Sequence, residues 1–420
     1  MVRAGERVVI DTHGPTAAPA AAPNVLPGWL VAVMAVATGF VVANLYFAQP
    51  LLHTIASEFG VGPGAAATVI TTTQIGYAAG LVLLVPLGDL FRRRNLVPAI
   101  FAVTMVCLIV CAVAPTLLVF EIGTIAVGLT SIGGQIMIPF AASLAPEERR
   151  GRVVARMMTG LLMGILLART FSGSLSELVG WRSIYWISAA VMLAFAVLLR
   201  RTLPTEPLRQ HQGYPRLVAS EFVLLATEPV LRFRAVLGAL SFAAFSLIWT
   251  ALTFVLSASP YNFGPGIIGL FGLVGAVGVL GANLAGKLAD ANRTSLTTIG
   301  SIVLAIGACG LIALGSFFLG ALLIGIIVLD LATQGVMITN QAVIYGLRPD
   351  ASSRMNSAYM FCYFVGGAIG SALAGITFAG AGWDGVCLVG AAFWALMMGA
   401  VAVEWVRRDR RPAIVPSPID

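Results

Sequence analysis

The chain has 420 residues, of which 59% are hydrophobic and only 10% are charged, and its mean hydropathy is +0.95. Water-soluble domains carry about 25% charged residues, so this composition excludes a soluble globular fold and predicts a protein whose solvent is the lipid bilayer. The formal net charge of +7 is compatible with nucleic-acid binding, but the basic residues follow the ends of apolar segments, which argues for membrane topology instead.

Residues 1–27 are rich in alanine and proline and contain no apolar stretch of the kind found in signal peptides, so we expect a disordered cytoplasmic tail. Beyond this tail, apolar runs of about 18 or more residues predict twelve membrane-spanning helices. They lie at residues 28–52, 64–88, 95–113, 116–143, 153–177, 182–199, 233–257, 265–288, 296–315, 319–346, 355–379 and 385–405.

The basic residues orient these spans. If the N-terminus is cytoplasmic, 23 of the 25 lysine and arginine residues fall in cytoplasmic segments, and only Arg169 and Arg182 do not. This bias predicts an even number of spans with both termini cytoplasmic. The long polar interruption at 201–230 then reads as a cytoplasmic linker between two six-helix bundles, with a short surface helix at 217–225.

The two bundles, residues 28–200 and 231–406, are predicted to be copies of each other, followed by a second cytoplasmic tail at 407–420. The first bundle contains PLGDLFRRR (residues 86–94) and the second contains GKLADANR (residues 286–293), each at the exit of an apolar helix. Other matches recur at nearly the same offset, including Trp181 with Trp383. The predicted fold is therefore an all-α integral membrane protein with two pseudo-symmetric six-helix bundles around a central cavity.

Polar residues are unevenly distributed among the spans. The third, sixth, ninth and twelfth spans contain no amide or charged residue in their central parts, which is typical of lipid-facing helices. The other spans carry the side chains that we expect around a central cavity, unless they only join packed helices by hydrogen bonds. These candidates are Asn44, Tyr46, Gln49, Gln74, Gln135, Gln334, Asn340, Tyr359 and Tyr363.

Three charged residues lie well inside predicted spans and are candidates for substrate binding or proton coupling. Asp330 lies about 17 Å from the outer end of its span, near mid-bilayer, with no evident basic partner at that depth. Glu121 and Arg169 lie at similar depths on adjacent antiparallel helices, so an ion pair between them is as plausible as a substrate contact. Asp330 is either a proton carrier or a hydrogen-bonded structural carboxyl.

The charged turns after the second and eighth spans are candidates for a cytoplasmic gate. An aspartate at a helix C-terminus is unfavourably placed for the helix dipole and needs donors nearby. We expect these turns to hold the cytoplasmic ends together in one state and to separate in the other, the alternative being a solvated turn that only sets topology. The gate residues are Asp89, Arg92, Arg93, Arg94, Gly286, Asp290 and Arg293.

These motifs resemble the major facilitator superfamily, and most closely its bacterial drug:proton antiporter and sugar-efflux branch. The family motif G-x-L-x-D-R-x-G-R-R is matched at Leu87, Asp89, Arg93 and Arg94, with other residues at its two glycines and first arginine. The arginine that the family often uses in the fourth span falls on Thr124 here. The fifth-span motif ending G-P-x-x-G-G is also absent.

The resemblance implies a secondary active transporter that works by alternating access and exports a small amphipathic or sugar-like compound in exchange for protons. The alternatives are a proton symporter that imports a small polar solute and a membrane receptor or scaffold. We expect no enzyme activity and no cofactor or metal, because a nucleotide-binding loop, an HExxH motif and an intramembrane nucleophile–base pair are missing. The expected partners are a small-molecule substrate, protons and lipid, with no nucleic acid, for a monomer in the bacterial plasma membrane.

Overall fold

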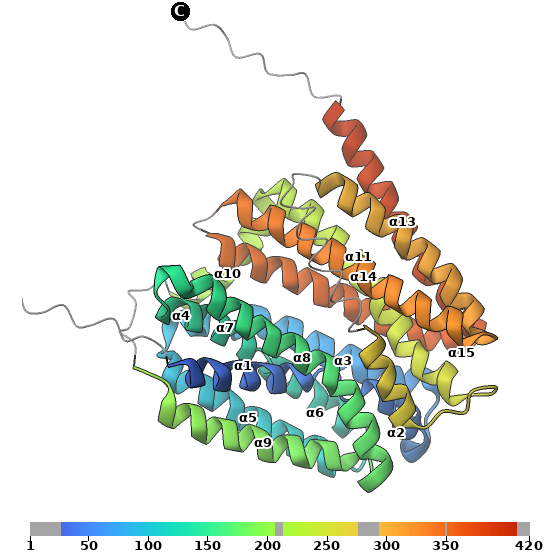
Figure 1. Cartoon of the computed structure of the whole chain (residues 1–420), viewed down its shortest axis with the longest axis horizontal. Coiled ribbons are helices and arrows are strands. Elements are labelled where there is room, and N and C mark those ends of the chain that lie inside the picture. Colours follow the sequence, from blue (N-terminus) through green and yellow to red (C-terminus); the bar gives the residue numbers. More distant parts are fainter. Residues whose placement is uncertain (1–26, 206–212, 276–293, 349–350, 410–420) are drawn as a thin grey trace, which may run out of the picture.

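The computed structural model describes residues 27–205, 213–275, 294–348 and 351–409, and these residues form helices and turns without any strand. The long helices run in roughly one common direction (Figure 1). The elements are α1 (Gly28–Ala43), η1 (Gln49–Leu51), α2 (Leu52–Phe59), α3 (Pro63–Leu83), α4 (Leu87–Leu90), α5 (Arg93–Val113), α6 (Leu117–Thr130), α7 (Gly133–Leu144), α8 (Glu147–Val179), α9 (Arg182–Thr202), α10 (Tyr214–Thr227), α11 (Pro229–Ser257), α13 (Thr294–Ala313), η2 (Leu314–Ser316), α14 (Leu319–Leu347) and α15 (Ser352–Asp409).

The described helices lie at the positions of the predicted spans, although two of those spans are broken into shorter helices. Nine helical segments among the described residues are long and apolar enough to cross a membrane, and α1 and a helix at Pro265–Gly275 are shorter apolar segments. The last segment, α15, contains two predicted spans, which are separated where Gly382 adopts φ 64° and ψ −159°. That backbone conformation is open to glycine and costly for other residues. The second part of the predicted span 265–288 lies outside the described residues.

Two predicted spans are interrupted. The span predicted at 28–52 breaks after α1, and the chain passes through turns before η1 and α2. Asn44 begins this break and donates its side-chain amide to Val41 O at 3.1 Å, and Pro50 within η1 has no amide hydrogen to continue a helical ladder. The span predicted at 116–143 breaks between α6 and α7, where Ser131 Oγ donates to Val127 O at 2.7 Å.

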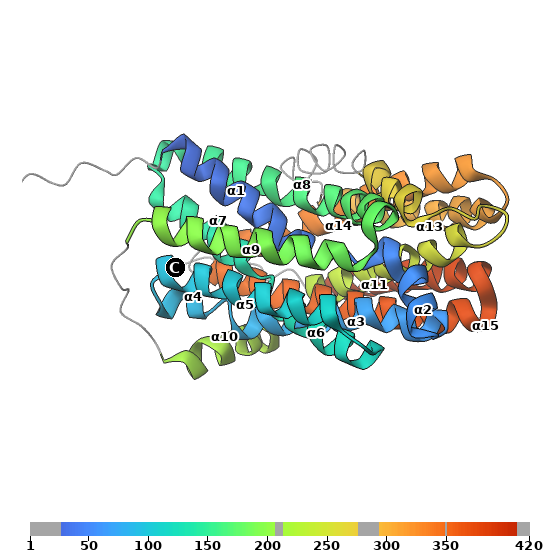
Figure 2. The ribbon, with the colours of Figure 1, turned by 90° about the horizontal axis from the view of Figure 1, so that it is seen from below.

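The chain divides into a first half (α1–α9) and a second half (α11–α15), which lie side by side in Figure 1. Equivalent helices make equivalent contacts in each half, since α1 packs on α8 as α11 packs on α15, and α5 packs on α6 as α13 packs on α14. Figures 1 and 2 place α4 and α10 at one end of the bundle, the linker end, and α2 at the other, the far end. The repeated contacts agree with the predicted duplication.

Small residues bring the paired helices into backbone contact. A Cβ atom added to Gly39 of α1 would collide with the backbone of Gly160 in α8, and a Cβ on Gly164 would collide with Gly39. In the second half, Gly366 and Gly370 approach the backbone of α11 equally closely. Small residues are the usual means of close helix packing in membranes, because dispersion contacts rather than the hydrophobic effect hold such helices together.

The linker between the halves contains α10, which is longer than the predicted segment 217–225 and packs against both halves at the linker end. Tyr214 donates its hydroxyl to Leu83 O of α3 at 2.8 Å, and Phe222 packs edge-on against Phe361 of α15. Between these contacts Glu221 is buried, with 4% of its surface exposed. The helix therefore contacts both halves, and its buried carboxyl group lies near Ser357 of α15.

Burial raises the pKa of Glu221 from its usual 4.5 to about 7, against the opposing effects of a hydrogen bond from Ser357 and the positive charge of Arg354. Because the docked helix holds the proton more tightly, its docking is strongest below pH 4.5. It weakens as the pH rises through about 7, by at most about 3 kcal/mol.

We predict that hydrogen exchange in α10, corrected for the intrinsic effect of pH, is slower at pH 5 than at pH 8, and that Glu221→Gln removes this difference. The control is Glu228→Gln, which changes a carboxyl that accepts from Arg348 at the end of the same linker. Equal protection of unmodified α10 at both pH values would contradict the prediction.

Candidate functional site

A cavity of about 570 Å³ lies between the two halves. Its wall is formed by α1, α3, α7 and α8 of the first half and by α11, the Pro265–Gly275 helix, α14 and the first part of α15. None of its described lining residues belongs to α5, α9, α13 or the part of α15 after Gly382. This confirms the prediction that every third span is peripheral to a central cavity.

The two halves meet tightly at the far end of the cavity. Glu177, near the end of α8, accepts a hydrogen bond from Gly266 N at 2.8 Å, and Thr170 donates to Gly269 O at 3.0 Å. Thr253 of α11 donates to Gln49 O at 2.8 Å. The cavity lining continues instead towards the linker end, as far as Val85 and Ser353. The structure is therefore closed at the far end.

Arg169 of α8 lies at the closed end of the cavity, with only 6% of its surface exposed. Its Nε donates to Gln49 Oε1. The guanidinium carbon lies 4.9 Å from the ring centroid of Tyr46 and 4.2 Å from that of Trp249, so aromatic rings stabilise the cation by cation–π interactions. Among the described residues, Nη2 has no hydrogen-bond partner.

Asp330 of α14 lies on the other side of Trp249. The indole Nε1 of Trp249 donates to Asp330 Oδ1 at 3.1 Å, while the ring of the same residue contacts Arg169. Arg169 and Asp330 attract each other, but no direct ion pair within 4.0 Å joins them in the described part of the chain. The sequence suggested no basic partner for Asp330, and the structure shows one in the opposite half.

The ion pair considered between Glu121 and Arg169 is not formed in the structure. Glu121 is half-buried on α6, does not line the cavity, and accepts a hydrogen bond from Thr68 of α3. Its direction around the helix axis takes it to α3, whereas Arg169 faces the second half.

Comparison with known proteins identifies the family. The family model described as Major Facilitator Superfamily matches residues 32–371. The chain belongs to this superfamily. It is a multi-pass membrane transporter and not an enzyme.

The relatives include transporters from bacteria. An uncharacterized transporter, YgaY, of Escherichia coli O157:H7 is 46% identical over 362 residues, which cover 86% of this chain and 92% of that protein. The "Probable transporter SCO4007" of Streptomyces coelicolor is 32% identical over 378 residues, or 89% of this chain and 87% of its own. A solved structure of a bacterial homologue of the human lysosomal transporter Spinster has a TM-score of 0.70 at 12% identity, covering 91% and 96% of the two chains. That likeness supports the fold.

Some of the remaining candidates line the cavity of this transporter, and others lie away from it. Those that line the cavity with Arg169 and Asp330 are Tyr46, Gln135, Gln334 and Tyr363. Gln74 instead donates to Ser246 of the second half at 2.9 Å. Asn44, Asn340 and Tyr359 hold helices together within one half, since Asn44 accepts from Ser188 of α9 at 2.7 Å and Asn340 donates to the hydroxyl of Tyr359 at 3.4 Å.

Part of the predicted gate lies at the linker end. Arg93 donates to Gly88 O at 3.0 Å and to Asp89 Oδ1 at 3.2 Å. Arg94 donates to Thr205, and Arg92 is exposed. The second copy, with Gly286, Asp290 and Arg293, lies outside the described residues.

Sequence reasoning did not assign site roles to three residues that shape the cavity. Trp249 is not among the residues predicted from the sequence, although it connects the two buried charges. A Cβ on Gly272 would come within 3.0 Å of Arg169 Cβ, and a Cβ on Gly275 would collide with Asp330 Oδ2. The signal was present as glycines at every third position, 266, 269, 272 and 275, which place a bare helix face towards the site.

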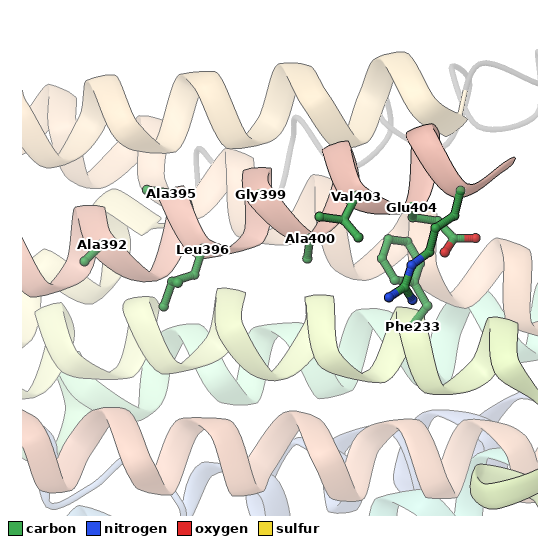
Figure 3. Close-up of a pocket in the computed structure, with 9 residues that line it drawn as sticks. Phe233, Ala392, Ala395, Leu396, Gly399, Ala400, Val403 and Glu404 are labelled. Carbon is green, nitrogen blue, oxygen red and sulfur yellow. The ribbon is translucent and has the colours of Figure 1, made fainter. Parts of the chain in front are cut away.

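A larger hollow of about 810 Å³ lies elsewhere, along the part of α15 after Gly382 (Figure 3). Its lining is apolar except for Glu404 and Arg407 near one end, and it includes Phe233 of α11. It contains none of the candidate site residues. Its mostly apolar lining suits contact with lipid, so its greater volume does not make it the transport site.

We predict that Gly275→Ala displaces the Asp330 carboxylate from Trp249 and lowers the free energy of unfolding by about 1–2 kcal/mol, the range for a hydrogen bond between membrane helices. The cost should shrink when Trp249→Phe has already removed the bond. Unfolding by denaturant in mixed micelles measures both values. The control is Gly310→Ala, where an added Cβ meets no atom within 4 Å. Equal costs of Gly275→Ala in the two backgrounds would contradict this account.

Proposed function

We propose that this transporter is a proton-coupled exporter of a small amphipathic compound that works by alternating access. The observation that supports this best is the placement of Arg169 and Asp330. They are buried opposite charges from different halves, at the closed end of the cavity, connected through Trp249. Charges inside a membrane protein are costly and mark functional positions. A proton on Asp330 would cancel the attraction between the halves and so affect their relative position.

We propose that the linker end faces the cytoplasm of a bacterial cell and that the protein lies in the plasma membrane with both termini inside. Several arginines lie towards this end of the bundle. They belong to the turn at 92–94, to the last turn of α9 and to the first turns of α11. The positive-inside bias supports this orientation. The cavity then loads from the cytoplasm, which is the arrangement that an exporter needs before each cycle.

The cavity wall supports an amphipathic cargo, because aromatic and aliphatic side chains dominate it and only a few polar groups converge at its closed end. The motifs shared with the efflux branch of the superfamily also favour export. A symporter that imports a polar solute is the second candidate. It is favoured by an amide cluster nearer the linker end, where Gln341 donates to Asn356 Oδ1 at 3.2 Å.

The two ends of the bundle are proposed to hold alternative gates. At the far end, the Glu177 carboxylate caps the N-terminus of the Pro265–Gly275 helix in the opposite half, where the helix dipole favours a negative charge. At the linker end, we propose that Asp89 and the arginines at 92–94 hold the halves together when the cavity opens at the far end.

We predict that Asp330→Asn lowers substrate-driven proton movement about a hundredfold, because the amide cannot carry the proton. The measurement uses purified protein in liposomes with a pH-sensitive dye inside and candidate substrates outside. The direction of the proton movement relative to the substrate distinguishes the exporter from the symporter.

The matched control is Glu121→Gln, because this carboxyl bonds to Thr68 away from the cavity. It should leave proton movement almost unchanged. The coupling role of Asp330 would be refuted if the unmodified protein moved no protons with any substrate gradient, or if Asp330→Asn still moved them.

We also predict that Glu177→Gln increases the population open at the far end about two- to fivefold, because it removes the charge that stabilises the helix N-terminus. Double electron–electron resonance between spin labels at two exposed positions measures the populations. These positions are Leu178, next to Glu177 in the last turn of α8, and Phe317, directly after η2 in the second half.

The control for this experiment is Glu58→Gln. Glu58 lies at the same end but bonds to Trp181 and Arg182 within its own half. It should leave the distance distribution unchanged. A shift of similar size for both variants would show that the far end responds to any lost carboxylate rather than to a gate between the halves.

A further inference from the structure

Arg169 lines the cavity, and one nitrogen of its guanidinium has no hydrogen-bond partner among the described residues. Its Nε is used by Gln49, and the rings of Tyr46 and Trp249 lie close to the guanidinium. Nη2 lacks a hydrogen-bond partner among the described residues, although only 6% of the surface of Arg169 is exposed. An unsatisfied donor at a charged, buried group is costly, and an oxyanion satisfies a guanidinium edge better than any neutral acceptor.

The protein does not supply that oxyanion. Asp330 Oδ1 accepts from Trp249, Oδ2 lies against Gly275, and no direct ion pair with Arg169 is formed in the described part of the chain. Trp249 therefore holds the Asp330 carboxylate by a hydrogen bond and keeps it from pairing directly with Arg169. The cavity is therefore lined by an arginine with a hydrogen-bond donor that no described residue uses, near an aspartate that already accepts a hydrogen bond from Trp249.

The wall next to this edge is aromatic. Phe242 stacks with Tyr363 at 4.1 Å between ring centroids and with Phe245 at 5.7 Å, and Phe364 packs edge-on against Phe242. All four residues line the cavity. A flat apolar body can pack against these rings, and the volume of about 570 Å³ is within the usual range for small-molecule sites.

We infer that the cargo of this cavity is an amphipathic organic anion, whose carboxylate or similar oxyanion binds the Arg169 guanidinium while its aromatic or alicyclic body packs against Phe242 and Tyr363. This inference rests on the proposed transport function and narrows its substrate class. A cationic compound would meet the Arg169 charge at the closed end of the cavity. A neutral sugar would leave the aromatic wall without an apolar partner.

The test uses three probes of the same shape and different charge, namely 2-naphthoate, 2-naphthamide and 2-naphthylmethylammonium. Binding to the purified full-length protein in detergent is measured by isothermal titration calorimetry. We expect 2-naphthoate to bind at least about tenfold more tightly than the amide and the ammonium compound, because the charged hydrogen bond is made only by the carboxylate. Equal binding of all three, preference for the cation, or no binding of any probe at millimolar concentration would overturn the inference.

The variant Arg169→Gln should remove the preference of the protein for 2-naphthoate and leave the binding of 2-naphthamide within about twofold, since the aromatic wall is unchanged. This comparison does not depend on full stability, because a misfolded variant would lose both probes. The control is Arg182→Gln, an arginine that pairs with Glu58 far from the cavity. If Arg169→Gln kept the carboxylate preference, the anion site would be elsewhere and the inference wrong.

The experiments can therefore contradict the proposed transport function and the anionic substrate class independently of each other. If 2-naphthoate binds as expected but no substrate gradient moves protons in liposomes, the anion site stands and the proton coupling is wrong. If protons move with a substrate that carries no negative charge and 2-naphthoate does not bind, the transport function stands and the anionic substrate class is wrong.

Discussion

The central constraint on this structure is the burial of one guanidinium and one carboxylate near each other without a direct bond between them. A direct ion pair would satisfy both charges and lock the two halves together. Trp249 prevents this, because its ring contacts Arg169 and its Nε1 donates to Asp330. The two charges attract each other across the indole, so their mutual stabilisation remains sensitive to a proton or to a ligand charge.

This arrangement depends on a helix that presents only glycines to the two charged residues. The Pro265–Gly275 helix passes both charged residues, and its glycines at 272 and 275 leave the volume that Arg169 and Asp330 occupy. The N-terminus of the same helix receives the Glu177 carboxylate at the far end. The Pro265–Gly275 helix therefore contacts α8 of the first half at two places, at Glu177 in the closed gate and at Arg169 in the charged site. Movement of this helix relative to α8 would change both contacts together.

The sequence predicted the class of fold, the duplication and the peripheral position of every third span, because these follow from hydrophobicity, repetition and the absence of polar groups. It could not predict direction around each helix axis, which decides whether Arg169 meets Glu121 or Trp249. The break after α1 was also missed, because the run 28–52 is apolar throughout most of its length and only Asn44 and Pro50 mark the turn. Gln49 reaches Arg169 from this broken segment, so a continuous first helix would give the wrong register for the site.

An anionic cargo would also constrain the coupling. While Asp330 is ionised, part of the field of Arg169 is offset by that carboxylate, and an approaching oxyanion is repelled by it. A proton on Asp330 cancels this repulsion and leaves the donor edge of Arg169 to the cargo. Binding of the anion would therefore be linked to the protonation of Asp330, so the substrate class and the proton coupling depend on the same pair of charges. Such a site moves its cargo outward or inward according to the two gradients, so the gates at Glu177 and Asp89, which set the population of each state, would influence the rate of transport and not its direction.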